Sequence, residues 1–265
     1  MEKMKKFFVS FIIGLLAFLF VGLYYYIQWK PLWSLEKPRT IYSVIHHEDD
    51  TLRIVMIGDS WVGMRSDTLN KSFQIQMSTI SGRSVILKSK GRGGEKSRGI
   101  YQLIFEENGM GTKTLLESGA DYCVLFAGIN DAAANLGKKQ FVYHMKLIVD
   151  FLLANDIRPI IIEIPDVDIW NVYSGKPFKD LIVDYIRSLM TQSGIYNYPE
   201  YREALKSMLK GCGLIDSVIY VKMSGWNGDS AINKCLFLDD QIHLNHQGYL
   251  RLDSCIIDAI LKDLQ

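Results

Sequence analysis

The chain is expected to fold as an α/β protein, a three-layer α/β/α sandwich on a mostly parallel five-stranded sheet, preceded by one N-terminal transmembrane helix. Three observations predict this. Short apolar runs alternate with amphipathic segments from residue 51 onward, the pattern of parallel strands covered by helices on both faces. Polar loops follow several of these runs, where the carboxyl ends of strands would lie. A long uncharged apolar stretch at the N-terminus stands apart from this alternation.

The composition is that of one folded domain with an extension. With 265 residues and 48% hydrophobic content, the chain can bury one sizeable core. Its 30 Lys and Arg residues balance 29 Asp and Glu residues, so it lacks the basic footprint of a nucleic-acid-binding protein. No long run of like charge and no fixed-period repeat occurs. Nucleic acid is therefore not an expected partner, and the oligomeric state stays open.

The N-terminal stretch predicts a membrane anchor. Phe7–Ile27 contains no charged residue and would span about 30 Å as a helix. Three lysines precede it within residues 1–6, and an aromatic group (residues 24–26 and Trp29) lies at its far end. A cleaved signal peptide is the alternative, but bulky aromatic residues occupy the place of a cleavage site. We expect an uncleaved single-pass anchor with a cytoplasmic N-terminus and the main domain in the periplasm or outside the cell.

The sequence then divides into three parts. Residues 1–27 form the cytoplasmic tip and anchor, and residues 28–50 read as a stalk with two prolines and mixed charge. Residues 51–265 form the main domain. The adjacent His46 and His47 in the stalk are interpreted as solvated side chains and not as metal ligands.

The elements of the main domain follow in order. Strands are expected near residues 53–57, 85–87, 122–126, 159–164 and 218–221. Helices are expected over residues 67–80, 97–108, 112–118, 141–153, 181–190, 201–209 and 246–264. Residues 166–179, which are rich in aromatic residues, are expected to form a loop that shapes the site.

The first strand ends in Gly58-Asp59-Ser60, which would deliver a serine at the carboxyl edge of the sheet. Glycine permits the sharp turn that leaves the hydroxyl exposed. An ordinary strand-to-loop turn would use the same residue types, so this motif alone decides little.

Three further motifs follow in the chain: Gly91-Arg92-Gly93-Gly94, Gly128-Ile129-Asn130-Asp131 and Asp240-Gln241-Ile242-His243. Together with Gly58-Asp59-Ser60, and in this order, they resemble the four sequence blocks of the SGNH (GDSL-type) hydrolases. The resemblance covers residue 51 to the end of the chain and implies a flavodoxin-like hydrolase domain.

The resemblance implies a role for each of these residues. Ser60 would be the nucleophile, His243 its general base and Asp240 the group that orients the imidazole, as in other serine hydrolases. The backbone N–H groups of Ser60 and Gly94 and the side-chain amide of Asn130 would form the oxyanion hole. Asp239 is a second carboxylate beside Asp240, but the family spacing selects Asp240.

Two residues beside the expected site depart from the common family pattern. Trp61 follows the serine where leucine is frequent, and Arg92 precedes the oxyanion glycine. Both are candidate substrate-binding residues. The Trp61 ring either stacks on a sugar or belongs to the core, and the sequence does not decide between the two.

No metal or cofactor is expected. Asp240, His243 and His246 are spaced three residues apart and could be the ligands of a zinc ion. The resemblance explains the first two without metal. Glycine spacing at residues 91–94 matches neither a Walker loop nor a dinucleotide-binding loop. Among Cys212, Cys235 and Cys255, a pair between the first two is one possible disulfide.

The sequence thus predicts a membrane-anchored serine esterase that removes acyl groups, O-acetyl groups above all, from an envelope or exported glycan. Three alternatives remain open: a lysophospholipase or thioesterase, a glycan O-acyltransferase, and an inactive tethered binding module on the same fold. The acyl group and the alcohol partner of the substrate are not determined by the sequence.

Overall fold

The computed structural model describes residues 2–39, 42–167, 175–223, 225–226 and 234–265. The chain divides into two compact units, residues 1–36 and residues 37–265. The first unit is the helix α1 (Glu2–Trp33) with its short continuation. Within it, Glu2–Tyr26 has a mean hydropathy of 2.5 and is long and apolar enough to cross a membrane, judged by length and composition.

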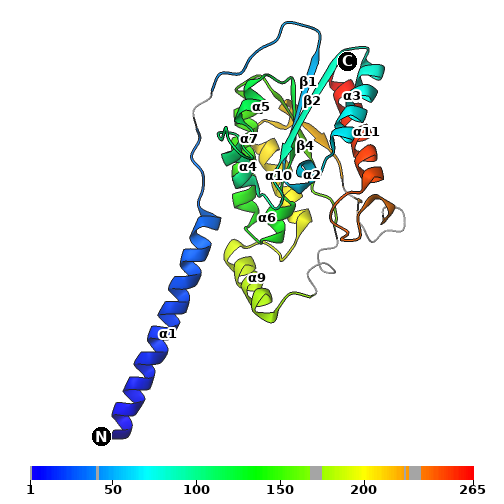
Figure 1. Ribbon diagram of the computed structural model, residues 1–265. Coiled ribbons are helices and arrows are strands. Elements are labelled where there is room, and N and C mark those ends of the chain that lie inside the picture. The colour runs from blue at the N-terminus through cyan, green and yellow to red at the C-terminus, as the bar shows by residue number, and fades with distance from the viewer. Residues whose placement is uncertain (1, 40–41, 168–174, 224, 227–233) are drawn as a thin grey trace. The chain divides into compact units, whose positions relative to one another are not determined.

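The second unit is built on a five-stranded parallel sheet with the order β2-β1-β3-β4-β5 (Figure 1). Its strands are β1 (Leu52–Gly58), β2 (Val85–Gly91), β3 (Tyr122–Phe126), β4 (Arg158–Ile162) and β5 (Ile219–Val221). Every neighbouring pair is parallel; Gly58, for example, pairs with Gly91 on one side and Phe126 on the other. The central strand β3 is apolar and buried throughout, and β1 departs from this only at the partly buried Arg53 near its start, as strands covered on both faces require.

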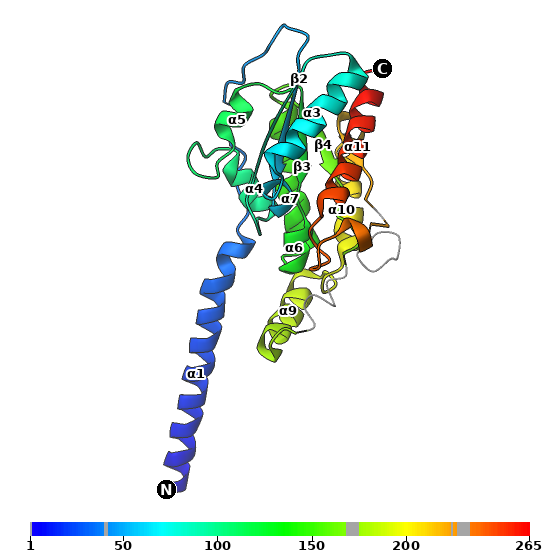
Figure 2. The ribbon, with the colours of Figure 1, turned by 45° about the vertical axis from the view of Figure 1, so that its right-hand side comes forward.

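Helices cover both faces of the sheet, which completes the expected three-layer sandwich (Figure 2). One face carries α3 (Asp67–Ser81) and α11 (His246–Asp263), which contact each other. The other carries α4 (Ser97–Leu103), α7 (Lys138–Leu153) and α10 (Tyr198–Gly211), with α4 and α10 both packed on α7. The remaining helices are α2 (Ser60–Gly63), α5 (Lys113–Glu117), α6 (Ile129–Ala133) and α9 (Phe178–Thr191), and two 3₁₀ turns cover Ile215–Ser217 and Lys234–Leu236.

The strand order places a crevice at the carboxyl edge of the sheet. The chain moves to one side of β1 to form β2 and returns to the other side to form β3, so the connections that leave β1 and β3 diverge there. Gly58 permits the two strand ends to come together, because a Cβ atom at this position would lie 2.3 Å from the carbonyl oxygen of Phe126. Ser60 and Asn130 follow these two strands directly.

Residues 42–50, which belong to the segment expected to be a stalk, lie along the surface of the domain. The Tyr42 hydroxyl donates to the carbonyl of Ile104, and the N–H of Ile45 donates to the carbonyl of Glu117. The Tyr42 ring also packs against Phe105 and Phe151.

The four cysteines all lie in the described part of the chain and none of them forms a disulfide there, so the expected Cys212–Cys235 pair is absent from the described residues. The first of them, Cys123, is a buried residue of β3, and burial raises the pKa of its thiol. It therefore acts as a small apolar side chain in the core.

Candidate active site

Ser60 lies at the carboxyl end of β1, as the first residue of the short helix α2. Asp59 caps this helix, because its side chain accepts a hydrogen bond of 3.0 Å from the N–H of Trp61. The cap fixes the turn between strand and helix. As a result, the Ser60 hydroxyl is held at the edge of the sheet and is partly exposed.

His243 and Ser60 are 183 positions apart in the chain, yet their side chains meet. The Nε2 atom of His243 lies 2.9 Å from the Oγ atom of Ser60. Its Nδ1 atom lies 2.6 Å from the Oδ2 atom of Asp240. This is the geometry of a nucleophile, a base and an orienting carboxylate in a chain of hydrogen bonds. Asp239 is exposed, and it is Asp240 that the structure brings to the imidazole.

A compact loop holds His243 in this position. The Oδ1 atom of Asp240 accepts the N–H groups of Ile242 and His243, each at 2.9 Å. The N–H of Leu238 donates to the carbonyl of His243, and Asn245 caps α11 directly after the loop. His246 is therefore the first residue of α11 and takes no part in the contact with Ser60.

The carboxylate of Asp240 is suited to hold a charged imidazole. Partial burial alone would raise its pKa, but hydrogen bonds from the His243 ring and from two backbone N–H groups outweigh this and lower the pKa below its usual value. Asp240 therefore stays ionised, and it would stabilise the imidazolium that forms when His243 takes a proton.

The three expected donors of an anion pocket surround the same edge of the sheet. Asn130 is the second residue of α6, after β3, and its Nδ2 atom donates a hydrogen bond of 2.9 Å to the carbonyl of Glu95. This bond uses one of the two amide hydrogens and fixes the side chain. The second hydrogen has only a long contact of 3.5 Å to the Oδ2 atom of Asp59. It is the one that a developing negative charge would attract.

The backbone donors are also available. Across the described residues, the N–H groups of Ser60 and Gly94 donate to no backbone or side-chain acceptor. Gly94 has φ +73°, a conformation that other residues adopt with strain, while the space around its Cα is open. Glycine is thus needed here for its backbone angle and not to avoid crowding.

The two candidate substrate-binding residues differ in exposure. The Arg92 side chain is 57% exposed beside the loop of Gly94 and forms an ion pair of 3.5 Å with Glu95, so it can reach a ligand. Trp61 is only 2% exposed, packs edge-to-face on Phe237 and accepts the Tyr249 hydroxyl on its carbonyl. Its ring belongs to the core. The interpretation of Trp61 as a stacking platform is therefore wrong, because the ring has no free face.

Two buried carboxyl groups lie directly behind the site, and the sequence analysis missed both. Burial raises the pKa of Asp59 to about 7, against the hydrogen bond from Trp61, and the nearby Asp131 adds to the rise. Burial likewise raises the pKa of Asp131 to about 6, against hydrogen bonds from the hydroxyl and the N–H of Ser97. The sequence could have indicated them by position alone, because Asp59 is adjacent to Ser60 and Asp131 is adjacent to Asn130.

We expect Asp59 to make the stability of the domain depend on pH. An unfolded aspartate has a pKa of about 3.9, so the folded state holds this proton more tightly. The free energy of unfolding should then fall as the pH rises from about 4 to about 7. Asp59→Asn keeps the oxygen that caps Trp61 and removes the titration. Between pH 5 and pH 8, the parent should lose on the order of 2 kcal/mol more of its free energy of unfolding than Asp59→Asn loses.

Denaturant unfolding at pH 5 and pH 8 checks this prediction, with the exposed Asp258→Asn as the matched control. Equal pH dependence in the parent and in Asp59→Asn would contradict the assignment.

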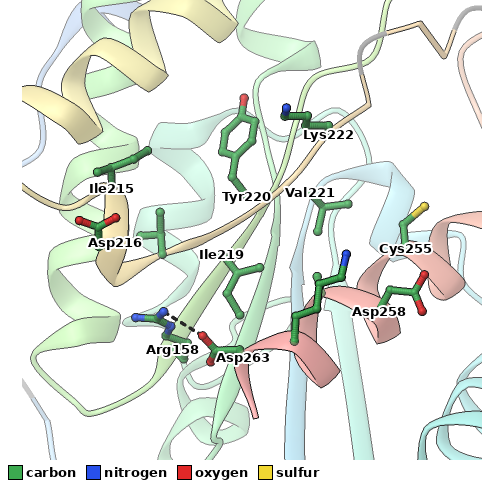
Figure 3. A pocket seen from close by; sticks show the side chains of 13 residues that line it. Arg158, Ile215, Asp216, Ile219, Tyr220, Val221, Lys222, Cys255, Asp258 and Asp263 are labelled. Atoms are coloured by element: carbon green, nitrogen blue, oxygen red, sulfur yellow. Dashed lines mark hydrogen bonds and ion pairs between the residues drawn. The ribbon is translucent and has the colours of Figure 1, made fainter. Parts of the chain in front are cut away.

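A cavity of about 640 Å³ lies elsewhere, between β5 and α11 (Figure 3). The ion pair of Arg158, the first residue of β4, with Asp263 lies in its wall, so the cavity reaches the amino end of the strands, away from Ser60. Its only cysteine is Cys255, whose thiol pKa is raised by burial, which disfavours the thiolate. The described residues around it include no nucleophile with a base.

No family model and no curated protein matches the chain, but solved structures do. A lipase/acylhydrolase from Enterococcus faecalis shares 16% identity, with 79% of this chain and 95% of that chain covered, at a TM-score of 0.59. The psychrotrophic esterase EstA from Pseudoalteromonas sp. shares 15% identity over 82% and 99% of the two chains, with a TM-score of 0.55. TesA shares 14% identity over 78% and 97%, with a TM-score of 0.54. The chain thus has the fold of these hydrolases.

Proposed function

We propose that this chain is an SGNH-type serine esterase, anchored in a membrane by α1, that hydrolyses acyl esters. The observation that carries the proposal is the unbroken contact from the Ser60 hydroxyl through His243 to Asp240, with distances of 2.9 and 2.6 Å. A binding module on the same fold would have no need of this arrangement. The structural neighbours described as lipases, acylhydrolases and esterases support the same chemistry.

In the proposed reaction, His243 takes the hydroxyl proton while the Ser60 oxygen attacks the carbonyl carbon of the ester. The tetrahedral intermediate places its negative oxygen among the Ser60 N–H, the Gly94 N–H and the Asn130 amide. The C–O bond to the alcohol then breaks, and His243 returns the proton to the departing alcohol. Water repeats the sequence on the acyl-serine, releases the carboxylic acid and restores Ser60.

The shape of the site favours a small acyl group on a large alcohol. The side chains of His243 and Asp240 are 25% and 44% exposed, so the described residues leave the catalytic groups in an open surface region. The described residues line one small cavity behind the site, next to Asp59, of only about 10 Å³, the space of one water molecule. We therefore infer that the substrate carries O-acetyl groups on an envelope or exported glycan, whose bulk remains outside.

A hydrolase acting on lipid-borne or long-chain acyl esters is the second candidate, because an apolar helix tethers the domain. A panel of acetylated sugars, p-nitrophenyl acetate and long-chain p-nitrophenyl esters separates the two candidates. We expect the acetyl esters to be cleaved faster. A preference for long chains would support the second candidate, and acylation of an added sugar acceptor would indicate transfer instead of hydrolysis.

Asn130→Ala should lower kcat by about 10²–10³-fold, because it removes one donor of the oxyanion hole. The KM for p-nitrophenyl acetate should change much less, since the charge develops only in the transition state. Steady-state kinetics checks this, with the exposed Asn108→Ala as control. If Asn130→Ala kept its kcat and stayed folded, Asn130 would have no place in the oxyanion hole.

A further inference from the structure

Helix α9 (Phe178–Thr191) exposes a continuous apolar face. Seven large apolar side chains of this helix are 38% to 78% exposed: Phe178, Leu181, Ile182, Tyr185, Ile186, Leu189 and Met190. Their spacing places them on one side of the helix, over an arc of about 180° at 3.6 residues per turn. By comparison, α3 exposes only two large apolar side chains, Ile75 and Ile80. Single exposed residues need no explanation, but a continuous face of this size does.

The polar side of the same helix is the one that packs on the domain. Asp184 is buried, and its carboxylate binds the ammonium group of Lys176 at 2.8 Å and the hydroxyl of Tyr196. The Arg187 guanidinium donates to the carbonyl of Ala134 at 3.2 Å. The helix thus packs on the domain with its polar side, whereas an ordinary surface helix buries its apolar side. Its orientation is fixed by polar contacts, and the described residues of the domain leave its apolar face exposed.

A lipid bilayer fits this face better than a second helix does. An arc of about 180° is wider than the narrow seam of a two-helix coiled coil, but it suits a helix that lies in the interfacial plane of a membrane. Lys179 lies near the border of the apolar arc, where its ammonium group can reach the headgroups.

The length of the chain also favours a bilayer, provided that α1 is the membrane anchor of the proposed function. The apolar part of α1 ends at Tyr26, and the second unit begins at Lys37, whose carbonyl accepts the hydroxyl of Tyr101. The residues between them span about 35 Å even when fully extended. This is less than the diameter of a domain of this size, on the order of 45 Å. The domain would therefore remain beside the lipid surface, where a bilayer is always within reach.

We propose that the apolar face of α9 inserts into the surface of the membrane that holds α1 and gives the domain a second contact with lipid. The contact has a consequence for the site. Through Arg187, α9 binds Ala134 at the end of α6, whose first turn carries Asn130. Insertion of α9 would thus bring the anion-pocket side of the domain toward the lipid surface.

Lipid photolabelling of the full chain tests this proposal. The protein is reconstituted in vesicles of phosphatidylethanolamine and phosphatidylglycerol that contain a phospholipid with a diazirine on its acyl chain. After illumination, tryptic peptides are analysed by mass spectrometry. We expect label in residues 180–187 and 188–202 to exceed that in the control peptide 72–83, which holds the exposed Ile75 and Ile80, by at least about fivefold, as an inserted helix requires.

Two triple variants sharpen the test. Leu181→Gln/Tyr185→Gln/Leu189→Gln should lower the labelling of α9 to the level of the control peptide, while hydrolysis of p-nitrophenyl acetate stays unchanged and reports a folded domain. Ile75→Gln/Ile80→Gln/Met64→Gln, in which all three side chains are also exposed, should leave the labelling of α9 unchanged.

The label in the tryptic peptide of residues 7–39, which contains the anchor, separates this proposal from the anchor on which it rests. Label in that peptide but none in α9 would overturn the insertion of α9 alone. Absence of label from both would remove the anchor as well. Disulfide-linked dimers that form on oxidation of Ile186→Cys but not of the parent chain, with its exposed Cys212 and Cys235, would identify a second copy of the chain as the occupant and would also overturn the proposal.

Discussion

Replacement of Ser60 by alanine is expected to lower kcat/KM for p-nitrophenyl acetate by at least about 10⁴-fold, to the level of a protein without a nucleophile. The variant lacks the hydroxyl oxygen that lies 2.9 Å from the Nε2 atom of His243 in the parent. The hydroxyl is partly exposed, so its loss leaves no large cavity, and the fold should remain intact.

The measurement is steady-state hydrolysis by the detergent-solubilised full chain, with unfolding temperature as a second readout. Ser254→Ala is the matched control, because it removes another exposed serine hydroxyl, from α11. Turnover retained by a folded Ser60→Ala protein would mean that another group attacks the ester, and the proposed mechanism would fail.

Asp240→Asn is expected to lower kcat by about 10⁴-fold with little change in KM. The amide can still contact the Nδ1 atom of His243, but as a donor it favours the wrong tautomer, and it no longer balances the charge of the imidazolium. Hydrogen bonds from the backbone of Ile242 and His243 can persist on the remaining oxygen, so the loop should keep its conformation.

The neighbouring carboxylate provides the control. Asp239 is exposed and adjacent in the chain, so Asp239→Asn changes the local charge equally without changing the contact with His243. We expect full activity from Asp239→Asn. If the two variants were equally impaired, the loss would reflect the local charge or the loop, and the role given to Asp240 would be refuted.

The strands and the longer helices could be predicted from the sequence because their signals are local. The apolar run that becomes β3 has the same bounds, Tyr122–Phe126, in the prediction and in the structure. The helix expected over residues 67–80 begins at Asp67 and is capped by Ser66, whose hydroxyl accepts the N–H of Leu69. Parallel order then placed the ends of β1, β2 and β3 at one edge of the sheet, and with them the motifs that carry Ser60, Gly94 and Asn130.

Other features depend on contacts between distant parts of the chain, which a single sequence does not reveal. Trp61 is buried because Phe237 and Tyr249 reach it from the far end of the chain. The carboxyl pair of Asp59 and Asp131 arises where β1 and β3 end side by side. Residues 181–190 are predicted as a helix, but the sequence gives no information on which side of this helix faces the domain. The polar contacts of Asp184 and Arg187 decide that.

The central claim is that Ser60 is an activated nucleophile, and its reaction with a fluorophosphonate tests this most directly. The Pseudoalteromonas esterase of the same fold is described as inhibited by monoethylphosphonate, a related group. Intact-protein and peptide mass spectrometry should find one adduct per chain, on Ser60, and none in His243→Ala. An unmodified Ser60 in the folded parent protein, or an adduct that forms equally well without His243, would contradict the account.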